Sequence, residues 1–136
     1  MSLFVDTSVW SLALRRDSVP ELPQVRALRV ALLDEEVVVT TGMVLQELLQ
    51  GFAGPKAARE IVERFAALPM ISPNRQDHIA AADLRNRCRR GGVQLGTIDA
   101  LFAELCIRHD MEMLSTDRDF VLAAAHCPLR VWTDGS

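Results

Sequence analysis

The stretch Leu3-Phe4-Val5-Asp6-Thr7-Ser8-Val9-Trp10 decides the fold of this chain. Residues 3–5 are apolar without polar alternation, which predicts a short strand buried on both faces, as in a parallel sheet. Ser8 is a favourable N-cap for a helix that begins at Val9. Asp6 therefore falls at the carboxyl end of a parallel strand, where open α/β sheets place their ligands and chemistry. A single aspartate at this point is also compatible with a turn or a cap.

Four further segments have strand character, and helical patterns separate them. These strands are expected at residues 36–40, 69–72, 111–115 and 129–132. Two helices are expected before each of the second, third and fourth strands, and one before the fifth. This order predicts an α/β fold with a central parallel five-stranded sheet flanked by helices, in a single three-layer domain over residues 1–136.

Composition indicates a protein without membrane partners. Of the 136 residues, 49% are hydrophobic and 24% are charged, and no apolar run reaches the roughly 20 residues that span a bilayer. No basic-then-apolar leader opens the sequence. Cys88, Cys106 and Cys127 form no CxxC pair, which favours a reduced, cytoplasmic location.

Three more acids stand where a carboxylate could approach Asp6. Asp117 follows the fourth strand directly, as Asp6 follows the first. Glu47 lies at the border of the apolar face of a helix, where an unpaired carboxylate is costly. Asp99 lies in the first turn of a helix that Thr97 is expected to cap, at the edge of its apolar stripe. A salt bridge for Glu47 and a helix-dipole contact for Asp99 are the simpler interpretations of these two residues.

Converging carboxylates at one edge of a sheet need a counter-charge. Two of them within about 4 Å cost about 4 kcal/mol at an effective dielectric constant near 20. A divalent cation removes this repulsion, and an all-oxygen ligand set favours Mg²⁺ or Mn²⁺. The sequence has no histidine or cysteine spacing typical of a zinc site. The chemistry that such an ion serves best is phosphoryl transfer.

The segments around these acids resemble the PIN-domain ribonucleases, and in size and layout their VapC-type toxin branch, from type II toxin–antitoxin systems. The matching segments are Val5–Trp10, the helix that contains Glu47, Thr97–Leu101 and Ser115–Phe120. The resemblance extends from Leu3 to Trp132. It implies a metal-dependent endoribonuclease that cleaves RNA with water activated by Mg²⁺ or Mn²⁺.

The resemblance also implies roles for individual residues. The four catalytic acids would be Asp6, Glu47, Asp99 and Asp117, with Asp6, Asp99 and Asp117 as metal ligands. Supporting roles would fall to Ser8, Thr116 and Asp119. Toxins of this kind form homodimers and are silenced by a small antitoxin, which binds across hydrophobic helices and often reaches the acidic pocket with a basic side chain.

Basic residues cluster near the end of the helix expected at residues 76–90. All 15 basic residues except Lys56 are arginines, and four of them crowd this end: Arg85, Arg87, Arg89 and Arg90. Because the guanidinium group makes forked contacts with phosphate, we expect them to hold the RNA backbone. A solvated helix face is the alternative. On the same helix Ile79, Ala82 and Leu84 are expected to point inward.

Other functions fit less well. A phosphatase of the haloacid dehalogenase type needs a second acid two residues after Asp6, where this chain has Ser8. A response-regulator receiver needs a lysine after a late strand, and the only lysine is Lys56. The remaining alternative is a PIN-like module that binds RNA or a partner without cleavage. The four intact acids favour the enzyme.

Overall fold

Strand β1 (Ser2–Val5) is the centre of a five-stranded sheet in which paired strands run parallel. The computed structural model describes residues 2–15 and 17–135. Within these ranges the strand order is β3-β2-β1-β4-β5. The other strands are β2 (Val38–Thr41), β3 (Met70–Ile71), β4 (Met111–Leu114) and β5 (Arg130–Val131). The predicted α/β fold with its parallel five-stranded sheet is confirmed.

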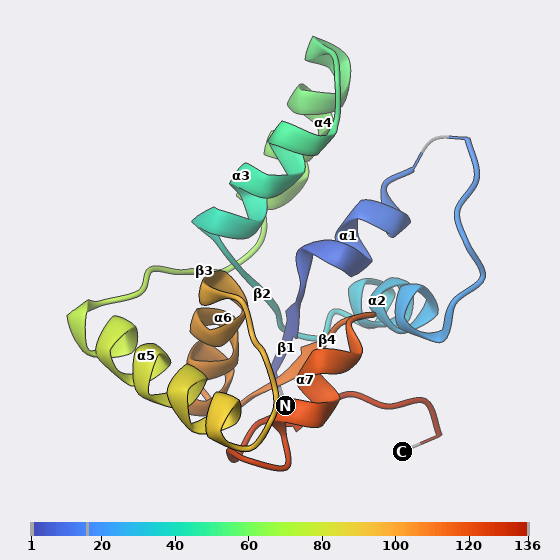
Figure 1. The fold of residues 1–136 in the computed structure, drawn as a ribbon. Helices are drawn as coiled ribbons and strands as arrows, with labels where there is room; N and C mark the ends of the chain where they lie inside the picture. Colours follow the sequence, from blue (N-terminus) through green and yellow to red (C-terminus); the bar gives the residue numbers. More distant parts are fainter. Residues whose placement is uncertain (1, 16, 136) are drawn as a thin grey trace.

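The described residues form seven helices, in the predicted order along the chain. They are α1 (Thr7–Ala13), α2 (Pro23–Leu33), α3 (Gly42–Gly51), α4 (Pro55–Ala66), α5 (Arg75–Arg90), α6 (Thr97–Arg108) and α7 (Arg118–Ala123). Helices α1 and α2 lie on one side of the sheet and α5 and α6 on the other, while the α3–α4 hairpin projects from the body (Figure 1). None of the described helices is long and apolar enough to cross a membrane.

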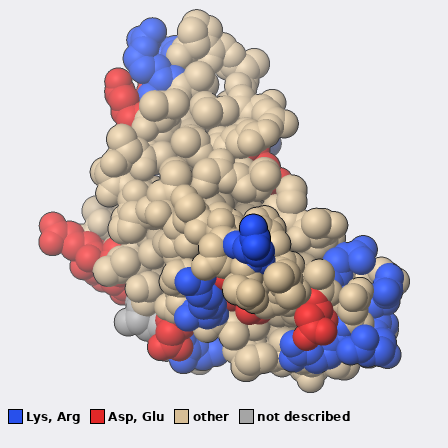
Figure 2. Space-filling model, turned by 90° about the vertical axis from the view of Figure 1, so that its left-hand side faces the viewer, with Lys and Arg blue, Asp and Glu red and all other residues tan. Residues whose placement is uncertain are grey.

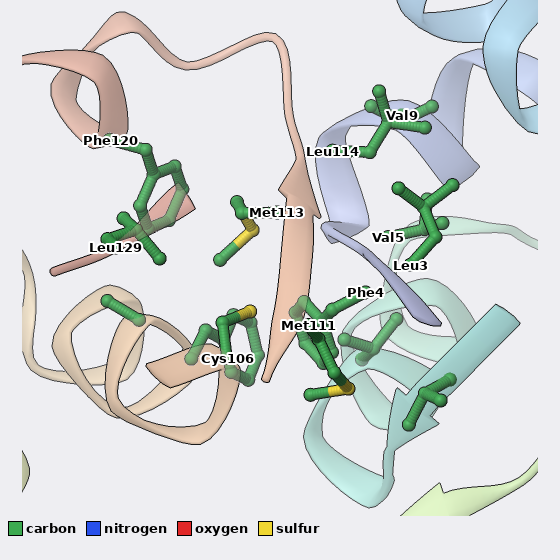
Figure 3. Close-up of a cluster of buried hydrophobic side chains, with 14 of the residues drawn as sticks. Leu3, Phe4, Val5, Val9, Cys106, Met111, Met113, Leu114, Phe120 and Leu129 are labelled. Carbon is green, nitrogen blue, oxygen red and sulfur yellow. The ribbon is translucent and has the colours of Figure 1, made fainter. Parts of the chain in front are cut away.

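The neighbouring strands β1 and β4 are largely buried, as the apolar run at residues 3–5 predicts for β1. On one face the ring of Phe4 packs against Phe102 of α6, with a centroid distance of 5.1 Å. On the other face Leu114 points toward α1, where Val9 lies, while Met113 points the opposite way (Figure 3). This two-sided packing fixes the carboxyl ends of β1 and β4 next to each other.

Two predicted helix caps are wrong. Helix α1 begins at Thr7, with Asp6 rather than Ser8 at the N-cap position. The Ser8 hydroxyl instead donates a hydrogen bond to Oδ2 of Asp6 over 2.9 Å. Helix α6 begins at Thr97, so its N-cap residue is Gly96. In both cases the chain enters the helix earlier than a capping side chain would suggest.

The predicted inner face of α5 is also largely wrong. Only Leu84 of the three expected residues is buried, whereas Ile79 is 56% exposed and Ala82 is exposed. The inner face begins with Asp77, whose side chain is 1% exposed. Its two oxygens each accept a hydrogen bond of 2.7 Å from the guanidinium group of Arg108. A buried acid, paired with an arginine of α6, therefore lies on the inner face of α5, for which only apolar residues were predicted.

Candidate active site

Carboxylates from four parts of the fold lie at the carboxyl edge of the sheet. Asp6 follows β1, and Asp117 is the N-cap residue of α7, three positions after the end of β4. Glu47 lies in the second turn of α3, and Asp99 lies in the first turn of α6. Because β1 and β4 pair directly, the chain segments that carry Asp6 and Asp117 leave the sheet side by side.

The charges of these acids act on one another. The pKa of Asp99 is raised from 3.8 to about 6, in the first place by burial. The negative charges of Asp6, Asp117, Glu47 and Asp119 raise it further, in that order. A neighbouring like charge disfavours the ionised form of a carboxyl group. The structure thus brings the four acids predicted as catalytic, and the supporting Asp119, into one electrostatic cluster.

Two serine hydroxyls hold the carboxylate of Asp6. Ser115 donates to Oδ2 of Asp6 over 2.8 Å, and Ser8 donates to the same oxygen over 2.9 Å. The two serines are themselves held by the chain after β4: Ser8 Oγ accepts from the Thr116 N–H over 3.2 Å, and Ser115 Oγ accepts from the Asp117 N–H over 3.0 Å. This network ties the exit of β1 to the exit of β4 and fixes the direction of Asp6.

Two hydroxyl residues of the site were missed by the sequence analysis, Ser115 and Thr7. Thr7 donates a hydrogen bond to Oε1 of Glu47 over 2.8 Å. Ser115 could have been found from strand register: Val5 pairs with Leu114, which places the next residue of each strand opposite the other. Thr7 carries no such signal, because its partner lies 40 positions away in a helix.

The donor set suits a hard divalent cation. One oxygen each of Asp6, Glu47 and Asp117 accepts a hydrogen bond from the protein, the last from the backbone N–H of Asp119 over 2.9 Å. Across residues 2–15 and 17–135, no hydrogen bond engages their other oxygens and no ion pair engages Asp99. Carboxylate oxygens without a basic partner are ligands that Mg²⁺ and Mn²⁺ accept.

The carboxylate groups of these acids are not close enough together to act as ligands of one metal ion. In the described ranges no group of three or more His, Cys, Asp or Glu side chains is arranged so that it could hold a metal ion. Like-charged carboxylates repel one another when no counter-charge lies between them. An ion bound among these acids would draw their carboxylates together.

The four arginines predicted to contact RNA lie outside this cluster, at the end of α5. Nε of Arg85 donates to the backbone carbonyl of Leu95 over 2.8 Å, and Arg87 and Arg89 contact side chains of α5 itself. Arg90 is exposed. Figure 2 views the molecule from the side on which α5 lies, and basic side chains gather at its lower right. These arginines form a surface that is separate from the acidic cluster.

Comparisons with known proteins agree with this geometry. A sequence model of the PIN domain matches residues 3–125 of this chain. The fold is similar to VapBC2 from Rickettsia felis, solved bound to a DNA fragment from its promoter, with a TM-score of 0.74, 17% identity, and coverage of 97% of this chain and 98% of that one.

Two more solved structures are similar over nearly the whole chain. FitAcB from Neisseria gonorrhoeae matches with a TM-score of 0.70 and 20% identity, covering 98% of this chain and 97% of that one. VapC20 from Mycobacterium tuberculosis, described as a sarcin-ricin loop cleaving toxin, matches with a TM-score of 0.68 and 19% identity, covering 94% of this chain and 98% of that one. At these identities the likeness shows a shared fold.

Proposed function

Because this chain belongs to the PIN domain family, we propose that it is a metal-dependent endoribonuclease and the toxin of a toxin–antitoxin pair. The observation that carries the proposal is the raised pKa of Asp99, to which the negative charges of four other acids contribute. Such a cluster is costly for the fold, and its chemistry is that of phosphodiester cleavage. VapC20, which shares the fold, is itself described as a sarcin-ricin loop cleaving toxin.

The proposal assigns a role to each acid. Asp6, Asp99 and Asp117 would hold Mg²⁺ or Mn²⁺, and Glu47 would complete the set of catalytic acids. When bound, the ion would lower the pKa of water and stabilise the developing charge on the leaving oxygen. Asp119 would add to the negative potential that attracts the ion.

The remaining hydroxyl residues position these acids. Ser8 and Ser115 fix one oxygen of Asp6 and leave the other directed to the site, and Thr7 does the same for Glu47. Thr116 contributes its backbone N–H to Ser8, and its side chain is proposed as a further polar neighbour of the ion. Positioned ligands of this kind typically change metal affinity or activity by about 10- to 100-fold.

RNA would reach the acids along the arginine-rich end of α5. Arg89 and Arg90 are exposed there, and Arg85 and Arg87 add positive charge beside them. Cationic side chains hold the phosphate backbone without reading sequence, so these contacts would set affinity rather than specificity.

The antitoxin would dock where residues of α1, α2 and α4 form an apolar groove. Trp10 and Leu32 line a cavity of about 130 Å³ here, with Arg29 and Arg64 at its edge. In the described part of the chain the buried indole Nε1 of Trp10 has no hydrogen-bond acceptor. A partner that covers this groove would contribute apolar side chains. The relatives VapBC2 and FitAcB bear the names of two-component assemblies.

We also propose that the protein acts in the cytoplasm as a homodimer. The three cysteines are free thiols in the structure, as expected for a reducing compartment. Light scattering of the purified protein measures the oligomeric state directly.

The decisive experiment measures cleavage of an end-labelled, unstructured RNA by the purified protein. We expect cleavage with Mn²⁺ or Mg²⁺ and none in EDTA. Asp6→Asn should lower the rate more than about 100-fold, because it removes one ligand charge while its shape is nearly preserved. Asp34→Asn is the matched control, since Asp34 is exposed at the end of α2.

Two results would contradict the proposal. Wild-type protein that binds RNA but leaves it intact with either metal would be the non-catalytic module considered from the sequence. Cleavage that survives both EDTA and Asp6→Asn would come from a contaminating nuclease. For the toxin assignment, expression should arrest growth, and co-expression of a short neighbouring reading frame should relieve the arrest.

A further inference from the structure

A pocket of about 410 Å³ opens beside the acidic cluster, between helices α3, α5 and α6. Its walls include Met43 of α3, Ala82 of α5 and Ile98 of α6. Met43 precedes Glu47 by one helical turn, which places the two side chains on the same face of α3. Ile98 is the immediate neighbour of Asp99 in α6. The pocket therefore lies against the two helices that carry Glu47 and Asp99.

Polar groups also line this pocket, and several of them have free hydrogen-bonding capacity. Arg85 uses Nε to bind the carbonyl of Leu95, while its two terminal nitrogens make no hydrogen bond with any described residue. The side chains of His78 and Thr97 likewise make none within the described ranges. Apolar walls with a few polar groups, in a volume between roughly 300 and 1,000 Å³, are typical of sites for small organic groups.

The charge of the pocket distinguishes it from a larger groove elsewhere on the described structure. That groove, of about 920 Å³, lies at the amino edge of the sheet, and its lining includes the acids Glu35, Glu36, Glu112 and Asp134. The pocket beside the acidic cluster has no acid among its lining residues and contains Arg85. The first groove has four acids against one arginine, Arg26, so the lining of the second pocket suits a group attached to a polyanion better.

We propose that this second pocket, here termed the base pocket, binds the base of an unpaired nucleotide next to the phosphodiester that the acidic cluster cleaves. This inference rests on the proposed nuclease function. Unpaired bases can turn away from the RNA backbone and be held by apolar contact and by hydrogen bonds to their edges. Met43 and Ile98 offer the apolar contact, and Arg85, His78 and Thr97 offer the hydrogen bonds.

The base pocket also joins the acids to the arginine-rich surface. Arg85 lines the pocket and lies one helical turn before Arg89, which is exposed at the end of α5. A single strand could therefore place a phosphate at the acids, a base in the pocket and its next phosphates along Arg89 and Arg90. Double-stranded RNA could not do so, because its bases are stacked and paired.

Binding in EDTA tests the base pocket without any need for cleavage. Ala82→Leu adds bulk at an exposed position of the pocket wall, so the core is left unchanged. Ala66→Leu is the control, because Ala66 is exposed on α4 and lines none of the described pockets. Fluorescence anisotropy with a labelled, unstructured hexaribonucleotide should show binding about tenfold weaker for Ala82→Leu, the scale expected for a single base. Binding to Ala66→Leu should equal that of wild type.

An oligonucleotide with one base removed provides the second arm. Scanning an abasic residue along the hexamer should reveal one position at which wild-type binding falls by about the same tenfold. At that position the abasic change and Ala82→Leu should not add, because both remove the same interaction. Unchanged binding by Ala82→Leu, or fully additive effects, would overturn the proposal.

A second copy of the chain is the alternative occupant, and the same variant identifies it. If Ala82→Leu converts a dimer into a monomer in light scattering, the pocket is a subunit contact and the proposal fails. Failure of the nuclease function would look different: RNA would bind with the predicted dependence on Ala82, yet metal would cause no cleavage.

Discussion

Ser115 donates a hydrogen bond of 2.8 Å to the carboxylate of Asp6, although 109 positions of sequence separate the two residues. The contact exists because β1 and β4 pair in parallel, with Val5 beside Leu114. The residue after each strand then faces its counterpart at the carboxyl edge. Strand pairing therefore sets the direction of one of the proposed metal ligands.

The first prediction concerns this hydroxyl. Ser115→Ala should lower metal-dependent RNA cleavage by about 10- to 100-fold, because Asp6 loses one of its two orienting donors. The loss should appear as a weaker apparent affinity for Mn²⁺ in a metal titration. Ser115→Thr keeps the hydroxyl and should restore most of the activity. Equal activity of Ser115→Ala and wild type at limiting Mn²⁺ would show that Ser115 only fills space.

The second prediction concerns Asp99 and pH. Its pKa in the folded protein is about 6, against an ordinary value of 3.8, so the folded state holds the proton more tightly than the unfolded chain does. Ionisation of Asp99 therefore destabilises the fold above pH 6, and this penalty disappears below about pH 4. Asp99→Asn should raise the stability of the metal-free protein at pH 7.5 by about 1–2 kcal/mol once solvent screening of the half-buried group is allowed for. Melting curves of both proteins in EDTA, at pH 7.5 and at about pH 4, check this.

The same two proteins test metal binding. A ligand at 100 times its dissociation constant stabilises the folded state by about 2.7 kcal/mol, so Mn²⁺ should raise the melting temperature of the wild type. Addition of Mn²⁺ should raise the melting temperature of Asp99→Asn much less. If Asp99→Asn is the less stable protein in EDTA and the wild type ignores Mn²⁺, Asp99 serves only the start of α6.

The third prediction concerns the arginine-rich end of α5. Replacing Arg89 and Arg90 by Glu should weaken RNA binding and flatten its dependence on salt. The slope of log K against log salt should fall by about 0.7 for each phosphate that the protein no longer neutralises. Arg59→Glu is the control, since Arg59 is exposed on α4. An unaltered slope would show that these arginines form only a solvated helix face and do not contact RNA.

The fourth prediction concerns the buried pair of Asp77 and Arg108. Burial acts to raise the pKa of Asp77, but the N–H of Asn74 and the charge of Arg108 outweigh it and hold the pKa below its usual value. Arg108→Met should therefore destabilise the protein by about 1–3 kcal/mol at pH 7. Because the pKa of Asp77 is depressed in the folded state, this contribution is present above pH 3.8 and is lost as the pH falls further.

A matched exposed pair provides the control for Arg108. Arg130 contacts Asp110, whose side chain is 84% exposed. Arg130→Met should change the free energy of unfolding by less than about 1 kcal/mol, as is usual for surface ion pairs. Urea unfolding of both variants measures the difference, and equal effects would show that the burial of Asp77 contributes nothing.

The order of the elements could be predicted because each depends on local pattern. The apolar run at residues 3–5 and the Asp that follows it were sufficient to place β1 in a parallel sheet and Asp6 at its carboxyl end. The electrostatic clustering of Asp6, Glu47, Asp99 and Asp117 followed from that placement. Whether these acids are the catalytic and metal-binding residues stays a prediction, as does the assignment of the chain to a single domain.

Side-chain contacts that no local pattern reveals explain why two features of the fold could not be predicted from the sequence. The burial of Asp77 depends on Arg108, 31 positions later, and no local pattern of α5 indicates this contact. The sequence predicts Ser8 as a helix cap, because local pattern does not show that its hydroxyl binds the Asp6 carboxylate instead. The Asp77 contact spans 31 positions of sequence, whereas the Ser8 contact is a local side-chain hydrogen bond that replaces the expected cap.

Strand β1, at the centre of the sheet, is synthesised before its partner strands. Its pairing is complete only after β4 has been made. β1 leaves the ribosome before any of its partners, and Ser115 follows Asp6 only after 109 further positions. At about 5–20 residues per second this delay lasts about 5–20 s. Until β4 has emerged, Asp6 lacks the hydroxyl of Ser115, and Asp117 is not yet beside it. A nascent chain therefore cannot assemble the acidic cluster until Asp117, the last of the four predicted catalytic acids, has been translated.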